Sequence, residues 1–130
     1  MNRFAWVLVL LLPFHPMLHP ARSQAQTPPR KTPELLKQGK AVFEKNCALC
    51  HGLKGDGKGQ LGATFKPPPN DFTKPLSEWP TTKGDMKKVF DAITKGVPNT
   101  SMVKWGHLSE KDRWALVHTV LEFSKPPAKK

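Results

Sequence analysis

The sequence predicts an all-α domain of three main helices joined by long irregular loops. Apolar residues recur at intervals of three or four in three segments, near 33–45, 83–95 and 109–123, as they do on one face of an α-helix. Each segment begins with a helix-capping pattern. No segment shows the strict alternation of apolar and polar residues that is typical of a β-strand.

The first helix is expected over residues 33–45. Thr32, Pro33 and Glu34 stand in the order that a helix start favours, namely a capping side chain, a first-turn proline and a first-turn acid. One apolar stripe follows, consisting of Leu35, Leu36, Gly39, Val42 and Phe43. Because glycine has no side chain, Gly39 leaves a notch at which another helix can come close.

The second helix is expected over about 83–95. Thr82, with Asp85 three residues later, resembles a capping box, and Gly96 ends the segment. Its apolar face consists of Met86, Val89, Phe90 and Ile93.

The third helix begins after Ser109, which with Asp112 repeats the capping pattern. Its broad apolar face consists of Trp114, Leu116, Val117, Val120 and Leu121. The helix reaches Phe123, and two prolines at 126 and 127 prevent it from continuing.

With 130 residues, the chain has room for one domain. Its start resembles a cleavable secretory signal, with a basic beginning, an apolar run over 4–14 and small residues at 23–25. That run is too short to span a membrane, which needs about 20 apolar residues. The expected parts are a signal peptide over 1–25, a flexible polar lead-in over 26–32, the domain over 33–124 and a basic tail over 125–130.

The strongest chemical signal is Cys47-Ala-Leu-Cys50-His51, because C-x-x-C-H is the attachment pattern for c-type haem. Two thiols on one helical turn can each add to a haem vinyl group, and the adjacent imidazole then lies beneath the iron. The stretch from Gly52 to Pro69 is rich in glycine and proline and is irregular. Long loops of this kind usually serve a function, and a bound cofactor would supply the missing core.

Three other uses of this motif compete with haem. A reactive dithiol is expected beside a βαβ pattern, which is absent here. A structural zinc site needs a fourth ligand, for which His107 or His118 is available. A plain disulfide accounts for Cys47 and Cys50 but leaves His51 without a role.

A haem iron has a second axial position, for which methionine suits reversible electron transfer. Met86 lies on an apolar helical stripe, where a methionine is usually core filler. Met102 lies in Gly96-Val-Pro-Asn-Thr-Ser-Met102, which Pro98 keeps from being helical. We therefore expect Met102 to be the distal iron ligand and His51 the proximal one.

The chain resembles the class I c-type cytochromes over residues 33 to about 124. The resemblance is carried by Gly39 to Phe43, Cys47 to His51, Gly96 to Met102, and Leu108 to Val117. It implies the cytochrome c fold, in which helices and irregular loops wrap around one covalently bound haem.

The resemblance also implies two packing relationships. The first and last helices cross, which would place Gly39 and Phe43 against the apolar face at Leu116, Val117 and Val120. A proline carbonyl in the loop after the attachment motif accepts a hydrogen bond from His51, and Pro67, Pro68 and Pro69 are the candidates. Where a typical member has an aromatic residue or alanine in the last helix, this chain has His118 and Thr119.

Two further features bear on the cofactor. Gly57, Gly59 and Gly62 match a dinucleotide-binding spacing, but no strand precedes them, so we expect these glycines to let the backbone pass close to the haem edge. Trp79 and Trp105 each carry an indole N–H able to donate to a haem propionate. Trp105 is favoured because it follows Met102 closely.

These observations predict a monohaem carrier of single electrons with no substrate chemistry of its own. Its formal net charge is +11, so we expect acidic redox proteins as partners, steered to exposed lysines. Export to the periplasm or beyond argues against nucleic acid. The alternatives are a haem-bearing subunit of a larger oxidoreductase complex, and a haem enzyme or gas sensor with an open sixth position.

Overall fold

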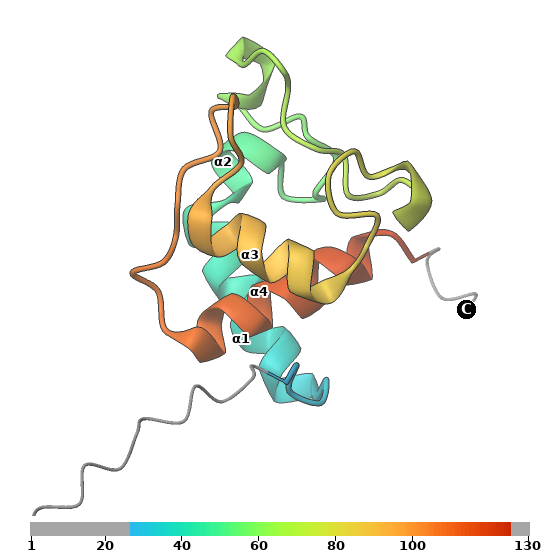
Figure 1. The fold of residues 1–130 in the computed structure, drawn as a ribbon, viewed down its shortest axis with the longest axis vertical. Helices are drawn as coiled ribbons and strands as arrows, with labels where there is room; N and C mark the ends of the chain where they lie inside the picture. The colour runs from blue at the N-terminus through green and yellow to red at the C-terminus, as the bar shows by residue number, and fades with distance from the viewer. Residues whose placement is uncertain (1–26, 126–130) are drawn as a thin grey trace, which may run out of the picture.

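The computed structural model describes residues 27–125, so the expected signal peptide and nearly all of the basic tail lie outside the described residues. The helices are α1 (Pro33–Asn46), α2 (Ala48–His51), α3 (Met86–Lys95) and α4 (Glu110–Phe123), with short 3₁₀ turns at Gly62–Thr64 and Leu76–Glu78. No β-strand occurs in this part of the chain, and the prediction of an all-α fold is confirmed (Figure 1). Within the same residues, no helix has the length and apolar character needed to cross a membrane.

The first and last helices begin at the predicted capping residues. The Thr32 side chain accepts a hydrogen bond from the Leu35 backbone N–H at 3.1 Å, and α1 runs one residue farther than expected, to Asn46. The Ser109 side chain accepts from the Asp112 N–H at 3.0 Å and caps α4. Both caps satisfy backbone donors that the first turn of a helix leaves unpaired.

The predicted start of the middle helix is wrong. Helix α3 begins at Met86, and its cap is Asp85, whose carboxylate accepts from the Lys88 N–H at 2.8 Å. Lys83 and Gly84 have φ angles of 51° and 74°, in the left-handed region. Residues in that conformation cannot belong to a right-handed helix, so the stretch from Thr82 to Asp85 forms a turn before the helix.

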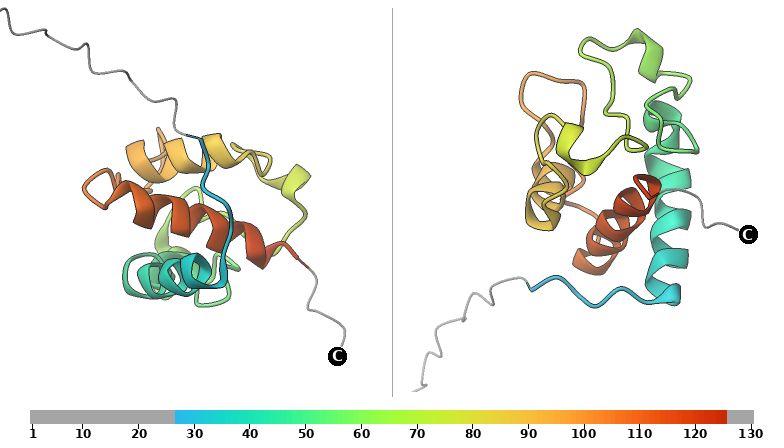
Figure 2. Two further views of the ribbon diagram at one scale, coloured as in Figure 1. Left: turned by 90° about the horizontal axis from the view of Figure 1, so that it is seen from below. Right: turned by 90° about the vertical axis from the view of Figure 1, so that its right-hand side faces the viewer.

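Helix α4 lies between α1 and α3 (Figure 2). On one side, Gly39 of α1 meets the Ala115 carbonyl and the Thr119 side chain of α4. Phe43 belongs to the same buried cluster as Leu116, Val117 and Val120. The resemblance placed both α1 residues against that apolar face. Phe43 lies there, whereas Gly39 meets Ala115 and Thr119, which lie beside that face on α4.

On the other side of α4, aromatic residues join it to α3. Phe90 and Trp114 stack with ring centroids 4.2 Å apart, and both are buried. The guanidinium of Arg113, the neighbour of Trp114 in α4, lies over the Phe90 ring, 4.8 Å from its centroid. A cation over an aromatic face adds electrostatic attraction to the packing, and together these contacts fix α3 on α4.

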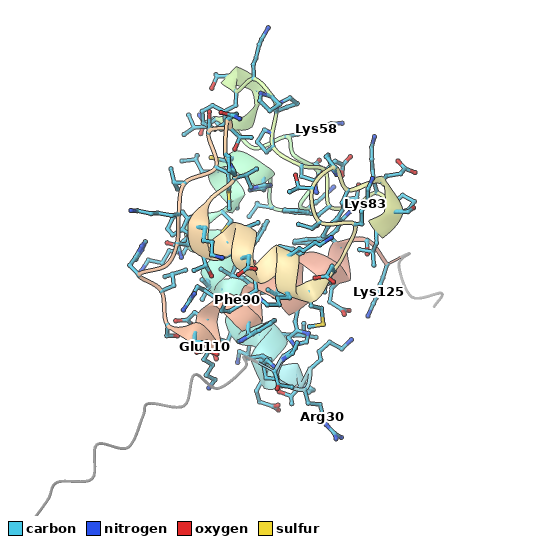
Figure 3. The ribbon with its side chains drawn as sticks, in the orientation of Figure 1. Arg30, Lys58, Lys83, Phe90, Glu110 and Lys125 are labelled. Atoms are coloured by element: carbon cyan, nitrogen blue, oxygen red, sulfur yellow. The ribbon has the colours of Figure 1, made fainter. Side chains whose placement is uncertain are left out.

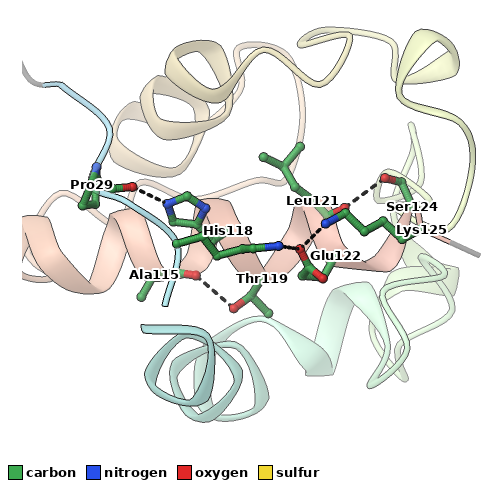
Figure 4. A network of polar contacts seen from close by, with 9 residues as sticks. Pro29, Ala115, His118, Thr119, Leu121, Glu122, Ser124 and Lys125 are labelled. Carbon is green, nitrogen blue, oxygen red and sulfur yellow. Dashed lines mark hydrogen bonds and ion pairs between the residues drawn. The ribbon is translucent and has the colours of Figure 1, made fainter. Parts of the chain in front are cut away.

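The segment before α1 crosses α4 on its way from the α3 side to the start of α1 (Figure 2). His118 Nε2 lies 2.9 Å from the Pro29 carbonyl oxygen (Figure 4). Lys31 Nζ lies 2.9 Å from a Glu122 carboxylate oxygen. Since a carbonyl oxygen only accepts hydrogen bonds, Nε2 of His118 carries the proton. The lead-in that composition predicted to be flexible is thus attached to α4 at two points.

Candidate functional site

The Cys47–His51 motif sits at the junction of two helices. Cys47 is both the C-cap of α1 and the N-cap of α2, and its carbonyl accepts a hydrogen bond from the His51 backbone N–H at 2.8 Å. This bond closes one helical turn, so the two cysteines and the histidine are held on a single short helix. Cys47 and Cys50 are half-buried and not joined in a disulfide.

A cavity of about 280 Å³, open to one side, lies next to this short helix. It brings together all four predicted site residues, Cys47, Cys50, His51 and Met102. The rest of the lining is mostly apolar and includes Phe65, Pro67, Pro68, Pro69, Phe72, Trp79, Val89, Ile93, Val97 and Val120. The loops that follow α2 and α3, whose course Figures 1 and 2 show, contribute lining residues between 65 and 82 and between 97 and 105.

The donors and the lining fit a haem. Cys47 and Cys50 supply two thiols for thioether bonds, His51 of α2 and Met102 of the loop after α3 supply an imidazole and a thioether from different elements, and the apolar lining suits the macrocycle. Among residues 27–125, no three or more His, Cys, Asp or Glu side chains form a group able to hold a metal ion by themselves. His107 and His118 therefore do not complete the zinc quartet that the sequence left open.

His51 is buried, with 9% of its surface exposed. Its ring stacks on Phe72 with centroids 4.7 Å apart. Burial lowers the pKa of His51, and a hydrogen bond to the Asn70 carbonyl opposes that shift in part. The imidazole is therefore favoured in its neutral form, which is the form that binds a metal.

The carbonyl that contacts His51 is that of Asn70, with Nδ1 and the oxygen 3.4 Å apart. The expectation that Pro67, Pro68 or Pro69 would supply this acceptor is wrong, and the three prolines instead line the cavity. A backbone carbonyl is present at every residue, so no feature of the sequence marked Asn70. With Nδ1 directed to this carbonyl, Nε2 is the nitrogen left to face a metal.

Burial also acts on the first cysteine of the motif. It raises the pKa of Cys47 to about 12, and the neighbouring Cys50 adds to the shift. The Cys47 thiol is therefore protonated at neutral pH. A reactive dithiol of the redox type requires a lowered thiol pKa, so the environment of Cys47 argues against that alternative.

The two methionines occupy different environments. Met102 lines the cavity from the loop after α3. Met86, in the first turn of α3, packs against the buried core cluster and is not among the residues that line the cavity. This arrangement agrees with the choice of Met102 as the candidate ligand, and its bond to iron stays a prediction.

The two tryptophans also differ. Trp79 is 1% exposed, and its indole N–H donates to the Lys74 carbonyl at 3.1 Å. That donor is already used within the protein. Trp105 is partly buried and also lines the cavity, which leaves it as the tryptophan that suits a propionate contact.

The glycine-rich loop packs against the back of α2. The N–H groups of Gly57 and Gly59 donate to the carbonyls of His51 and Cys50 at 2.8 Å and 3.1 Å. A side chain at Gly59 or Gly62 would collide with the Cys50 backbone. The glycines were expected to approach the haem edge; they are not among the residues that line the cavity, and they pack on α2 from outside it.

Comparison with known proteins agrees with this geometry. Residues 34–118 match the family model described as "Cytochrome C oxidase, cbb3-type, subunit III". The chain belongs to this family of c-type cytochromes. The cytochrome has the all-α cytochrome c fold and an electron-transfer role, and its family implies haem c as the cofactor.

Two relatives extend the comparison. The cytochrome is 40% identical over 58 residues to the Cbb3-type cytochrome c oxidase subunit FixP of Sinorhizobium medicae (strain WSM419), an alignment that covers 39% of this chain and 20% of FixP. It also resembles a chain of the Kuenenia stuttgartiensis reducing HAO-like protein complex Kustc0457/Kustc0458, with a TM-score of 0.58 and 33% identity. That match covers 76% of the cytochrome and 45% of the other chain. The cytochrome thus spans only a part of each relative.

Proposed function

We propose that this cytochrome binds one haem c, attached by thioether bonds to Cys47 and Cys50, and passes single electrons between redox proteins. His51 and Met102 are the proximal and distal iron ligands. The observation that carries the proposal is that Cys47, Cys50, His51 and Met102 all line one mostly apolar cavity. When bound, haem supplies an iron that exchanges one electron with little change in its surroundings.

The residues of this chain have separate roles in that function. Asn70 orients His51 through the contact at Nδ1, and Phe72 fixes the plane of the same ring by stacking on it. The apolar walls exclude water and keep the local dielectric low, which favours a buried thioether ligand. The open side of the cavity leaves an edge through which an electron can reach a partner.

We propose acidic proteins as the redox partners. Lys54, Lys58, Lys66, Lys87, Lys88 and Lys104 are all exposed. Other basic side chains, including Arg30, Lys83 and Lys125, lie around the periphery of the molecule (Figure 3). A basic surface of this kind accelerates encounter with an acidic one, so association rates should fall as salt rises. A rate unchanged between low and high salt would contradict the steering role.

We place the protein in the periplasm or outside the cell. Residues 1–25 have the sequence features of a secretory signal. Haem attachment at Cys47 and Cys50 in that compartment requires export of the chain first. Mass spectrometry of the matured protein should find an N-terminus at or near Gln26, and retention of residues 1–25 would contradict this location.

A second candidate is a haem-bearing subunit of a larger complex. Both relatives are described as parts of complexes, and the cytochrome covers only 20% of FixP and 45% of the Kuenenia chain. Size exclusion of the protein from its native source separates the two candidates. Elution at the mass of a monomer supports a free carrier, whereas co-elution with an oxidoreductase supports a subunit.

The first test of the function uses protein matured in a periplasm. A pyridine haemochrome spectrum with both vinyl groups saturated, and a mass increase of one haem, are expected. The ferric wild type should show the methionine-to-iron absorption band, and Met102→Ala should lose it. Met86→Ala is the matched control, since Met86 packs against the core cluster, and it should keep the band.

The outcomes separate the competing functions. Absence of attached haem would overturn the proposal and return Cys47 and Cys50 to another role. Haem attached with the band unchanged in Met102→Ala would remove Met102 as the ligand. Rapid binding of carbon monoxide by the ferrous wild type would indicate an open sixth position, as in a haem enzyme or gas sensor.

A further inference from the structure

The loop that carries Met102 is held closed by bonds within itself. The Thr100 hydroxyl donates to the Val97 carbonyl at 2.8 Å and accepts from the Met102 N–H at 3.1 Å. The Val97 N–H also lies 3.4 Å from the Met102 carbonyl oxygen. One side-chain oxygen therefore joins the first and last residues of the turn.

The backbone of this turn also depends on special conformations. Gly96 has a φ of 76° and Asn99 a φ of 59°, both in the left-handed region. A side chain at Gly96 would press on the Met102 carbonyl. The chain thus doubles back tightly, so that the start of the loop touches its end.

Beyond the turn, the returning chain is attached to α3, where the backbone N–H of Trp105 donates to the Ile93 carbonyl at 2.9 Å. Both ends of the segment are therefore fixed on the same helix. Between them, the backbone N–H of Met102 has the Thr100 hydroxyl as its partner. Removal of that hydroxyl would leave this N–H to water and loosen the residue that bears the candidate ligand.

We propose that Thr100 is a positioning residue for Met102, one that holds the loop in the conformation that presents the methionine sulfur to iron. The inference depends on the proposed function, since it takes Met102 as the distal ligand. A ligand held in place before it binds loses less entropy when it does so, and groups that orient a metal ligand contribute to its affinity. Thr100 also lines the cavity, but the role proposed here is exerted through its hydrogen bonds to Met102 and Val97 and not by binding the iron.

Thr100 is suited to a clean test because its side chain is exposed. Thr100→Val keeps the shape and removes both hydrogen bonds, whereas Thr100→Ser keeps the hydroxyl. Thr64→Val is the matched control, because the exposed Thr64 hydroxyl donates to the Leu61 carbonyl at 2.7 Å in a different turn. None of the three substitutions removes a buried group.

The measurement is the rate at which imidazole displaces methionine from the ferric iron of the matured full-length protein. We expect Thr100→Val to increase this rate by about three- to tenfold, the size associated with one hydrogen bond, because of the two bonds lost only the one from the Met102 N–H acts directly on the ligand residue. Thr100→Ser and Thr64→Val should stay within about twofold of the wild type. The methionine band at equilibrium and the thermal unfolding midpoint are recorded for every variant.

Each outcome decides the inference. A faster displacement in Thr100→Val alone supports it if the unfolding midpoints of Thr100→Val and Thr64→Val fall by similar amounts. A faster displacement with a larger fall in the midpoint of Thr100→Val would overturn it, because general destabilisation would then account for the rate. Equal rates in Thr100→Val and Thr64→Val, with the methionine band present in the wild type, would overturn the role of Thr100 and leave Met102 as the ligand. A wild type without the methionine band would overturn both the role of Thr100 and the assignment of Met102 as the ligand. The spectrum of Met102→Ala would then match that of the wild type.

Discussion

Gly39 lies against the side chain of Thr119 where α1 crosses α4. A β-carbon placed on Gly39 would overlap both the Thr119 hydroxyl and the Ala115 carbonyl oxygen. The hydroxyl donates to that same carbonyl at 2.9 Å, and Thr119 is 2% exposed. Thr119 is thus able to fill the notch beside Gly39 without leaving its polar atom unpaired.

This contact predicts that Gly39→Ala destabilises the protein, although alanine favours a helix more than glycine does by about 1 kcal/mol. Forcing an extra carbon into a packed crossing costs about 1–3 kcal/mol, and part of the obstacle is backbone, which cannot rotate away. Urea unfolding should show a net loss for Gly39→Ala.

The double variant Gly39→Ala, Thr119→Ala tests the reason for that loss. It should recover only a part of the lost stability, because the Ala115 carbonyl stays in place. Ala41→Gly, at an exposed position of the same helix, is the control for helix propensity. A gain of stability in Gly39→Ala would contradict the close crossing.

The cap of α3 provides a second prediction. Asp85→Ala removes the acceptor of the Lys88 N–H and should lower the free energy of unfolding by about 1 kcal/mol. Asp85→Asn keeps a side-chain oxygen at the same place and should lose only a few tenths of that amount. Circular dichroism during denaturation measures both variants, and equal losses in the two would show that capping is not the cause.

These elements show how far the sequence predicts the fold. Thr32 and Ser109 were identified correctly because a cap depends on residues within one turn. The prediction of a helix start at Thr82 failed because Lys83 and Gly84 have left-handed backbone angles, so that α3 begins only at Met86. The spacing of a threonine and an aspartate carries no information about these φ angles.

The same distinction holds at the site. Cys47, Cys50 and His51 form a local motif, so their positions on one short helix were predictable. The Asn70 carbonyl reaches His51 across 19 residues, and nothing in its side chain indicates that contact. Which tryptophan keeps its N–H available also depends on distant packing, since the Trp79 donor is used by the Lys74 carbonyl.

The end of α4 predicts a dependence on pH. Lys125 and Lys31 both donate to the Glu122 carboxylate, and in that order they lower the pKa of Glu122 below its ordinary 4.5. A carboxylate with a lowered pKa in the folded state adds stability above its ordinary pKa. That stability is lost as the pH falls through the lowered value.

Glu122→Gln should therefore reduce stability by less than about 1 kcal/mol at pH 7, because the pairs are partly exposed. The difference from the wild type should shrink below pH 4.5 and at high salt. Glu44→Gln, which removes a charge from the exposed face of α1, is the control. A difference for Glu122→Gln that stays constant from pH 7 to acid would contradict the ion pairs.

The wall behind His51 supplies the last prediction. Trp79 is almost fully buried, its indole N–H donates to the Lys74 carbonyl, and its ring centroid lies 5.0 Å from that of Phe72, which stacks on His51. Trp79→Phe removes the donor and leaves a void beside Phe72. We expect a loss of about 2–4 kcal/mol, because an unpaired carbonyl adds to the cavity term.

The control is Trp105→Phe, because Trp105 is partly buried and lies in the loop between α3 and α4. This variant should lose less free energy of unfolding than Trp79→Phe. Guanidinium unfolding gives the stabilities, and the rotation of the His51 ring is followed by NMR of the matured protein. Because Phe72 separates Trp79 from His51, Trp79→Phe should broaden the His51 signals while Trp105→Phe leaves them sharp. If the two variants lose equal stability and both leave His51 unchanged, then Trp79 does not support the proximal ligand.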